Sequence, residues 1–376
     1  MRTLLLALFA VAGCRGPLVY SCAQDNECVR AGKSGGQCVD SGRGRYCAFA
    51  DSACPDGRRF DPTAGESLGG LCVGAVPAGD LGGVGSDLGT AGPPLTWSPQ
   101  ISTTANDLWA VGGYDANHVW VTGQWDTHFT SDGGQTWKLQ TLPAALDHIA
   151  GIWARPGNAW LTGWFGTVST TNDGTSFKTN TIPNSDELYA IWGTDPANLF
   201  AVGNGGVVVH GVNGTWTEQT SNCSCAYLNA VWGGDANIVY AGGADGTVIR
   251  TTDGGKTWGP EGAPAGQTIY GMWGSGPSDV YAVGEQESII HRDGGGWSVL
   301  RAPNGNAQTG LVGVWGSGSD DVFAVGTNGT ILHSADHGAS WQAQQSGTTQ
   351  GLTGIWGSGP NDVFVVGAGG TIRHGK

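Results

Sequence analysis

The chain has 376 residues, of which 68 are glycine and 17 are tryptophan, while charged residues make up only 13%. This composition excludes a protein built of long helices and favours many short strands joined by tight turns. The net charge of −14 excludes a partner recognised through its phosphate backbone, because the sequence has no basic stripe, and we expect no nucleic-acid partner.

The first residues, MRTLLLALFAVAGC, combine a positive charge at Arg2 with an apolar run from Leu4 to Ala12. Such a segment is typical of an export signal and is too short to span a bilayer as a mature helix. Its end, Val11 to Cys14, resembles the lipobox of bacterial lipoproteins, which implies cleavage before Cys14 and a lipid on its thiol. Plain secretion is the alternative. Arg15 stands where the lipoprotein family uses aspartate for retention, which favours an outer-membrane lipoprotein of the bacterial cell envelope, facing the periplasm or the cell surface.

Eight cysteines remain after Cys14, and six of them fall within 51 residues. In an exported chain this density predicts a three-disulfide module, whose connectivity the sequence leaves open. A zinc site is the less favoured alternative, since these six include no Cys-x-x-Cys pair and no histidine lies among them. The six are Cys22, Cys28, Cys38, Cys47, Cys54 and Cys72. Cys223 and Cys225 lie alone downstream, and most simply pair with each other.

A segment rich in glycine, alanine and proline follows and shows no periodicity, which predicts a flexible linker. The expected organisation is therefore a signal peptide at 1–13, a cysteine-rich module at 14–72, a linker at 73–94 and a main domain at 95–376.

From Trp97 onward the sequence repeats with a period of about 40 residues, which predicts a solenoid or a propeller. One tryptophan marks most of the units. It recurs at Trp153, Trp192, Trp232, Trp273, Trp315 and Trp356, with spacings of 39, 40, 41, 42 and 41 residues. Gly112 occupies the same place 41 residues before Trp153, which makes seven units.

The unit from Leu311 to Trp341 shows the pattern inside a repeat. LVGVW alternates as a strand, GSGSD predicts a turn, VFAVG a second strand, TNG a tight turn and TILHS a third strand, and the loop ending at Trp341 leads into a fourth. Four antiparallel strands per unit form the blade of a β-propeller. We therefore predict an all-β fold, a seven-bladed β-propeller of four-stranded antiparallel blades.

The seventh unit stops at Lys376, directly after its third strand. The missing fourth strand is expected at the other end of the domain, because Trp97 precedes Gly112 by 15 residues and the matching aromatic residues precede their next units by 15 to 18. Residues around Thr96 to Ile101 are thus expected to complete the last blade and close the ring.

Four loops between third and fourth strands share one pattern: TSDGGQTW from Thr130, TTNDGTSF from Thr170, TTDGGKTW from Thr251 and SADHGASW from Ser334. Inside each loop the acidic or amide side chain can accept backbone N–H bonds, and a glycine can take a left-handed conformation. These loops resemble the Asp-box, or bacterial neuraminidase repeat. The resemblance is to the propellers of sialidases, sortilin-type receptors, xyloglucan hydrolases and photosystem II assembly factors, which share a fold but no chemistry. It implies that the four side chains are structural: Asp132, Asn172, Asp253 and Asp336.

The catalytic residues of a hydrolase of that family cannot be recognised in this sequence. Sialidase-like catalysis implies an arginine triad, a tyrosine nucleophile with a glutamate partner and an aspartic acid, on six blades. The propeller holds Arg155, Arg250, Arg292, Arg301 and Arg373, without the family's arginine-bearing N-terminal motif. Because two acids at the right separation suffice for glycoside hydrolysis, a glycosidase at the propeller mouth stays the alternative. We expect no catalytic residues, no cofactor and no metal.

Histidines recur at one aligned position, the end of the third strand, where unit four has Arg250. A pH-sensing or metal ring is conceivable. We expect packing at blade edges instead, because equivalent positions on different blades are too dispersed to share one ion. The histidines are His210, His291, His333 and His374.

Turns between second and third strands share a face with the blade-to-blade connections, and most of them contain only glycine and small residues. Three turns carry larger aromatic or acidic side chains: Trp125 with Asp126, Trp164 with Phe165, and Glu285 with Glu287. Asp126 and Glu287 replace a glycine of the other units, which gives up easy access to positive φ. Large aromatic side chains at exposed turn tips of adjoining blades would suit sugar rings or an apolar patch of a partner. They are the candidate ligand-binding residues, unless they only cap the linker or the cysteine module.

The sequence thus predicts an exported, lipid-anchored monomer that acts as a non-catalytic binding or assembly scaffold. Its partner would be an envelope protein or a surface glycan.

Overall fold

The computed structural model describes residues 94–143, 146, 148–171, 176–182, 187–264 and 266–376, together with three short strands nearer the N-terminus. The chain divides into two units, Met1–Leu88 and Gly89–Lys376. Among the described residues, no helix has the length and apolar character needed to span a bilayer.

The described part of the first unit is a three-stranded antiparallel sheet in the order β1-β2-β3. Its strands are β1 (Gln37–Asp40), β2 (Arg45–Ala50) and β3 (Arg58–Phe60). Cys38 and Cys47 lie directly opposite each other in the register of β1 and β2. The signal peptide, the lipid site at Cys14 and the other predicted disulfide cysteines of the module lie outside the described residues.

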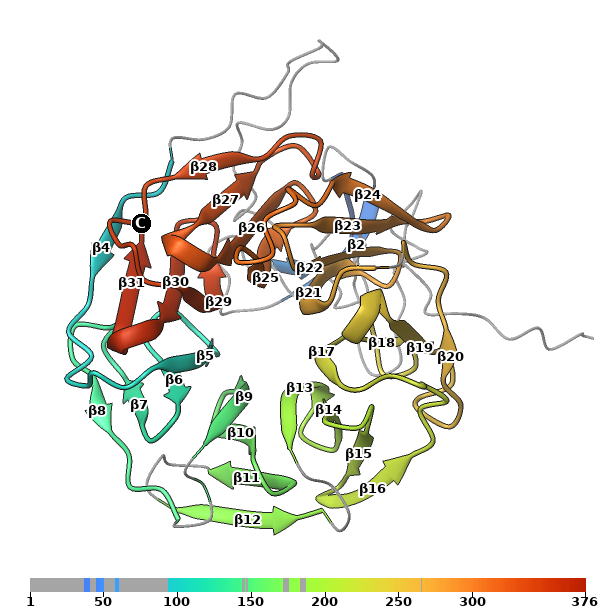
Figure 1. Cartoon of the computed structure of the whole chain (residues 1–376), viewed down its shortest axis with the longest axis horizontal. Coiled ribbons are helices and arrows are strands. Elements are labelled where there is room, and N and C mark those ends of the chain that lie inside the picture. The colour runs from blue at the N-terminus through green and yellow to red at the C-terminus, as the bar shows by residue number, and fades with distance from the viewer. Residues whose placement is uncertain are drawn as a thin grey trace, which may run out of the picture. The chain divides into compact units, whose positions relative to one another are not determined.

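The second unit is a ring of seven four-stranded antiparallel sheets, which confirms the predicted seven-bladed propeller (Figure 1). In each blade the first strand lies nearest the axis. The first strands are β5 (Leu108–Gly113), β9 (Ile149–Arg155), β13 (Leu188–Asp195), β17 (Leu228–Gly233), β21 (Ile269–Gly276), β25 (Leu311–Gly318) and β29 (Leu352–Gly359). The second strands are β6 (Val119–Gly123), β10 (Asn158–Gly163), β14 (Asn198–Gly203), β18 (Val239–Gly243), β22 (Asp279–Gly284), β26 (Asp321–Gly326) and β30 (Asp362–Gly367).

The two outer strands of each blade complete the sheets. The third strands are β7 (Thr127–Thr130), β11 (Thr167–Thr171), β15 (Val208–Val212), β19 (Val248–Thr251), β23 (Ile289–Asp293), β27 (Ile331–Ser334) and β31 (Thr371–Gly375). The fourth strands are β8 (Lys138–Leu139), β12 (Phe177–Thr181), β16 (Thr215–Gln219), β20 (Gly259–Pro260), β24 (Trp297–Arg301), β28 (Gln342–Gln344) and β4 (Trp97–Pro99).

The ring closes as expected, because β4 from the start of the domain pairs antiparallel with β31 at its end. The two strands, one cyan and one red, lie side by side in Figure 1. The indole of Trp97 is buried and donates a hydrogen bond to Oε1 of Gln344 at 2.8 Å, which fastens β4 to the neighbouring blade.

The hydrophobic core lies mainly between blades, since most clusters of buried side chains draw on two neighbouring sheets. Phe364 and Val366 of the last blade pack with Leu108 and Val111 of the first, for example. Second strands are buried on both faces, as the pattern of β26 shows, so the near-continuous apolar run VFAVG is what this position requires.

One element differs from its prediction. The segment GSGSD was expected to be a turn, but β25 continues through Gly318, with a register shift between Gly316 and Gly318. Glycine and serine contribute no apolar alternation here, so the pattern could not reveal the extension.

The loops between third and fourth strands that carry Asp132, Asp253 and Asp336, called the acidic loops below, form the hydrogen bonds that their residue types predict. In the loop from Thr251 to Trp258, Asp253 accepts the N–H of Thr257 at 2.9 Å and its hydroxyl at 2.7 Å. Asp132 and Asp336 make the same pair of bonds in their loops. Gly255 adopts a φ of +85°. The side chain of Asn172 lies outside the described residues.

The aligned histidines pack at blade edges, as expected. Each Nε2 contacts a side-chain oxygen at the start of the second strand, at 2.5 to 2.7 Å, and each ring stacks on an aromatic residue of that strand at 3.8 to 4.1 Å. The pairs are His210 with Asn198, His291 with Asp279, His333 with Asp321, and His374 with Asp362. Arg250, at the same position, pairs with Glu261 and lies over the ring of Tyr240.

Candidate functional site

The centre of the ring is a narrow channel of about 360 Å³ lined by all seven first strands. Its walls are mostly small residues: a Cβ on Gly271, for instance, would lie 2.7 Å from the carbonyl oxygen of Val312 on the next blade. Larger side chains enter the channel lining at Trp109, Tyr189 and Tyr270. The first strands therefore pack closely around the channel.

The turns singled out in the sequence lie on the same face as the blade-to-blade connections. Trp164 and Glu285 each form an isolated bridge to the connection leading into the next blade, at Glu187 and Gly310 respectively. The candidate residues of three blades therefore share one face of the ring.

An aromatic cluster forms on this face around His148. The imidazole ring is buried, stacks on Trp164 at 3.8 Å with an interplanar angle of 8°, and meets the edge of Trp125 at 4.5 Å. Trp109, at the channel, lies 5.7 Å away, and Phe165 packs edge-on against Trp164 at 6.5 Å. Trp125, Trp164 and Phe165 are thus brought together, as the hypothesis of a shared surface requires.

Exposure within this aromatic cluster (Trp109, Trp125, His148, Trp164, Phe165) is uneven. Phe165 is 64% exposed and Trp125 52%. Trp164, expected at an exposed turn tip, is instead half-buried, because it stacks on His148. The outcome is a rigid apolar platform with two exposed rings.

His148 and Trp109 were not predicted from the sequence as members of this surface. Neither lies in a turn; His148 directly precedes its first strand and Trp109 is the second residue of another. A signal was present, since the residue before the first strand carries a side chain in units one to five and is glycine in the last two, at Gly310 and Gly351.

Asp126 is engaged inside the protein. It accepts hydrogen bonds from the Thr104 hydroxyl and from Nδ2 of Asn106, the latter at 2.9 Å, and lies 3.8 Å from Nε2 of buried His128. Burial lowers the pKa of His128, against the raising effect of the Asp126 carboxylate. Asp126 thus holds the connection that joins the last blade to the first.

Glu285 and Glu187 each pair with a tyrosine near the channel. Glu187 accepts a hydrogen bond from the Tyr189 hydroxyl at 2.6 Å, and Glu285 accepts one from the Tyr270 hydroxyl at 3.2 Å. Burial, together with the neighbouring Glu285 carboxylate, raises the pKa of Tyr270 to about 12. Tyr270 therefore stays protonated and donates at neutral pH.

Glu287 differs from the expectation that replacing glycine gives up a positive φ at this turn. It keeps the left-handed conformation of the glycine it replaces, with a φ of +59°, and Gln286 before it has a φ of +56°. Only Asp126 abandons positive φ, because its turn closes one residue earlier, with the N–H of Gly123 bonded to Asp126 itself. The Glu287 carboxylate pairs with Arg301 at 2.7 Å, which supports the strained turn.

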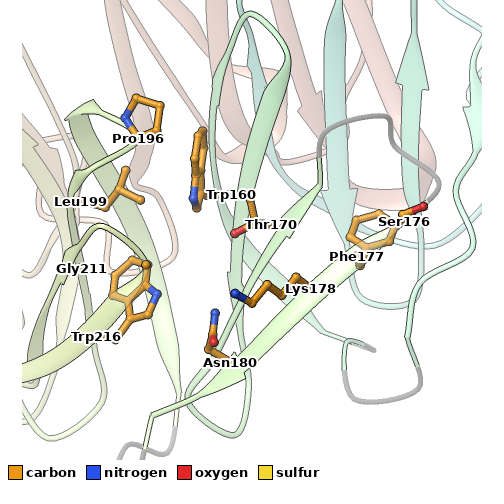
Figure 2. A pocket seen from close by; sticks show the side chains of 11 residues that line it. Trp160, Thr170, Ser176, Phe177, Lys178, Asn180, Pro196, Leu199, Gly211 and Trp216 are labelled. Atoms are coloured by element: carbon orange, nitrogen blue, oxygen red, sulfur yellow. The ribbon is translucent and has the colours of Figure 1, made fainter.

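A second hollow lies at the rim between the second and third blades, with a cavity of about 500 Å³. Figure 2 shows Leu199 and Trp216 at the left, Trp160 near the middle, and Lys178 and Asn180 below Trp160. Elsewhere an acidic loop covers the aromatic residue of the preceding blade, as Gly255 approaches Phe200; the third blade has only the short loop HGVNGTW. Because the hollow adjoins residues 172–175, outside the described part, we assign it no ligand.

The propeller's arginines do not converge. Arg250 and Arg292 both contact Glu261, Arg301 pairs with Glu287, Arg155 lies over Trp153, and Arg373 donates to the carbonyl of Gly347. Among the described residues, no three arginines form a clamp for a carboxylate.

Cys223 and Cys225 form a disulfide in the connection entering the fourth blade, as expected. A Cβ on Gly206 would lie 3.0 Å from the sulfur of Cys225, so the bridge packs on the turn of the preceding blade.

No model of a known protein family matches the chain, and no curated protein matches it. Among solved structures, the chain is similar to YCF48 bound to D1 peptide, at 18% identity and a TM-score of 0.63, over 76% of this chain and 96% of that one. YCF48 from Cyanidioschyzon merolae is similar at 16% identity and a TM-score of 0.61, over 74% and 98% of the two chains. A streptogramin B lyase is similar at 15% identity and a TM-score of 0.66, over 75% and 98%. These similarities support the propeller fold alone.

Proposed function

We propose that the propeller is a non-catalytic binding scaffold that holds a segment of a partner protein on its aromatic cluster. One observation carries the proposal: Trp125 and Phe165, 52% and 64% exposed, lie on two adjoining blades and contact the stack of half-buried Trp164 on buried His148. Exposed aromatic residues on a rigid base are typical of binding hot spots, because they bury large area and lose little conformational entropy.

The surrounding scaffold favours binding over chemistry. Asp126, Glu285 and Glu287 are engaged in internal hydrogen bonds or ion pairs, and first strands from all seven blades fix the channel beneath the platform. The partner would therefore meet a surface already in its bound conformation, which lowers the entropic loss on association.

A protein partner is favoured over a surface glycan by one further observation. YCF48, a propeller of the same fold, has been solved bound to D1 peptide, so a ring of this architecture can take a peptide. For this chain we propose an envelope protein as partner and a monomeric propeller.

The cellular setting rests on the N-terminal sequence. A lipobox-like end at Cys14 and six clustered cysteines support an Asp-box propeller held on the outer membrane by a lipid, beyond a disulfide module and a linker. The sequence from residue 73 to 94 would give the propeller reach from the membrane.

A glycosidase is the second candidate, because two carboxylates, Glu187 and Glu285, lie near the channel, each with a tyrosine hydroxyl. Glycoside hydrolysis needs two acids on either side of the scissile bond. Glycan turnover that disappears in E187Q and E285Q would favour this alternative over the scaffold.

The test compares two double variants of the full chain in pull-down from envelope extracts and on a glycan array. W125A/F165G removes both exposed rings, and the glycine suits the positive φ of +57° at Phe165. L139A/V299A removes exposed apolar side chains on other strands, 62% and 49% exposed, and serves as the control.

We expect W125A/F165G to weaken binding of the captured envelope protein by about 2 kcal/mol or more, with an unchanged melting temperature, and L139A/V299A to bind normally. Equal binding by both variants would contradict the platform. Selective loss of an array glycan instead of a protein would identify the glycan as the partner.

A further inference from the structure

The corner between the fifth and sixth blades brings together three groups that can ligate a metal ion. Asp279 begins β22, His291 lies on β23 of the same blade, and His337 lies in the acidic loop of the next blade. One ligand atom from each lies within 4.8 Å of the others. This departs from our expectation of no metal, which considered only a ring of histidines shared by several blades.

His337 occupies a position that does not suit its side chain. Its φ is +57°, in the left-handed region, whereas the matching positions of two other acidic loops hold Gly133 and Gly254, each with a φ of +70°. A side chain that is kept where the backbone favours glycine points to a role for that side chain.

The hydrogen bonding of His337 directs a lone pair into the corner. Its Nδ1 lies 3.1 Å from the carbonyl oxygen of Ser319, which can only accept, so Nδ1 donates in this contact. In the neutral ring, Nε2 is then an acceptor, and it lies 3.7 Å from Oδ1 of Asp279. A cation placed between these two atoms would be bound by both.

The other two groups are already oriented. His291 is 3% exposed and its Nε2 contacts Oδ1 of Asp279 at 2.6 Å. The second carboxylate oxygen of Asp279 accepts a hydrogen bond from the Ser275 hydroxyl. Backbone and hydroxyl partners behind the ligands are the arrangement that metal sites use to fix their first shell.

The distances suit a first-row transition ion. Bonds of about 2.0 Å in a tetrahedral site place ligand atoms about 3.3 Å apart, and the two separations from Oδ1 of Asp279 are 2.6 Å and 3.7 Å. Shifts of less than about 1 Å would admit the ion, and His291 would bind it through Nε2 as the neutral tautomer that carries its single ring proton on Nδ1.

The same corner holds a further unpaired polar group. The hydroxyl of Tyr281 is buried and finds no hydrogen-bond partner among the described residues, whereas Tyr240 at the same position of β18 donates to the carbonyl of Pro277 at 2.8 Å. The ring of Tyr281 stacks on His291 at 4.1 Å.

We infer that Asp279, His291 and His337 form a binding site for one divalent transition-metal ion such as Zn²⁺, which links the fifth blade to the sixth. Two histidine nitrogens and one carboxylate are a ligand set that this class of ion prefers. The site leaves a fourth position for water or for a group of a partner.

The chain supplies its own controls. The last blade has the same histidine–carboxylate pair, His374 with Asp362 at 2.7 Å, but Gly133 stands where His337 would be. H337G restores the residue type that the backbone favours, so it removes a ligand without endangering the fold. H374A disrupts a comparable pair that lacks the third ligand.

The experiment titrates Co²⁺ into the full chain, follows visible absorption, and then displaces Co²⁺ with Zn²⁺. We expect one ion per chain with the absorption of a four-coordinate site, affinity lowered at least about 100-fold in H337G, and unchanged affinity in H374A. Any ion held by the N-terminal cysteines would persist in H337G and is thereby separated.

Melting of the same proteins gives a second readout. Zn²⁺ should raise the melting temperature of the wild type and of H374A but not of H337G, since only a bound ion stabilises the folded state. Wild type that binds Co²⁺ no more tightly than H337G would overturn the site.

Discussion

The residues that depart from the repeat fall into two groups, those with a partner inside the protein and those that stay exposed to solvent. Asp126 and Glu287 meet partners inside the protein, at Asn106 and Arg301. Trp125 and Phe165 keep more than half of their surface in solvent. The architecture explains the first group, and for the second we propose a partner from outside the chain, so exposure is the property that distinguishes the two groups.

The carboxylate of Asp253 is predicted to make stability depend on pH. Hydrogen bonds from the Thr257 hydroxyl and N–H lower the pKa of Asp253 to about 2, from an ordinary value of 3.8. A lowered folded-state pKa contributes stability above the unfolded value, and this contribution is lost as the pH falls from about 4 to about 2. D253N should therefore be less stable than wild type at pH 7, and the two should converge near pH 2.

Urea denaturation from pH 7 to pH 2 measures this effect. E218Q removes one charge from exposed β16 and is the matched control, which should run parallel to the wild type. A constant difference between D253N and wild type over the whole range would contradict the role of the carboxylate charge.

Residue-level prediction succeeded where a repeat position fixes the geometry. The turn between second and third strands is such a position, so Trp125, Trp164 and Phe165 could be placed on one face from the sequence. His148 and His337 were missed because each acts across a blade boundary, and periodicity within one unit carries no information on such contacts.

At the level of elements, closure by β4 was predictable because the count of strands left one missing. The side chain of Trp97 shows why closure is firm: its ring meets Phe323 edge-on at 6.5 Å, and its indole N–H is bonded to Gln344. Deletion of residues 95–102 should abolish cooperative unfolding, because it leaves the core between the last two blades open.

The control for that deletion removes eight residues from the predicted linker, 79–86. Thermal unfolding followed by near-ultraviolet circular dichroism, which reports the packing of the tryptophans, should show one sharp transition for the control and a broad one for the 95–102 deletion. Identical transitions would contradict closure by β4.

Around the ring, one contact between neighbouring blades recurs at five of the seven junctions, whereas a Cβ on Gly193 would instead meet Leu199 of its own blade. The tryptophan of a first strand packs on the glycine that follows the tryptophan of the next blade: a Cβ on Gly233 would lie 2.4 Å from Trp192, and one on Gly316 would lie 2.5 Å from Trp273. The first blade has Gly112 in place of tryptophan, and the next blade accordingly tolerates Ala154. The Trp-Gly step that marks the repeat is therefore an interface between blades, which sequence spacing alone did not reveal.

This interlock predicts a coupling that a double-mutant cycle can measure. G233A should lower the free energy of unfolding by about 1–3 kcal/mol, because the new methyl group overlaps the Trp192 ring. In the W192A background, itself destabilised by about 3–5 kcal/mol, the same change should be nearly neutral, since the ring is gone and the nearest remaining atom, the carbonyl oxygen of Ile238, would lie 3.0 Å away. If urea denaturation shows that the destabilisations of G233A and W192A simply add, the strain caused by G233A arises within its own blade. The contact between Trp192 and Gly233 would then not explain the Trp-Gly repeat.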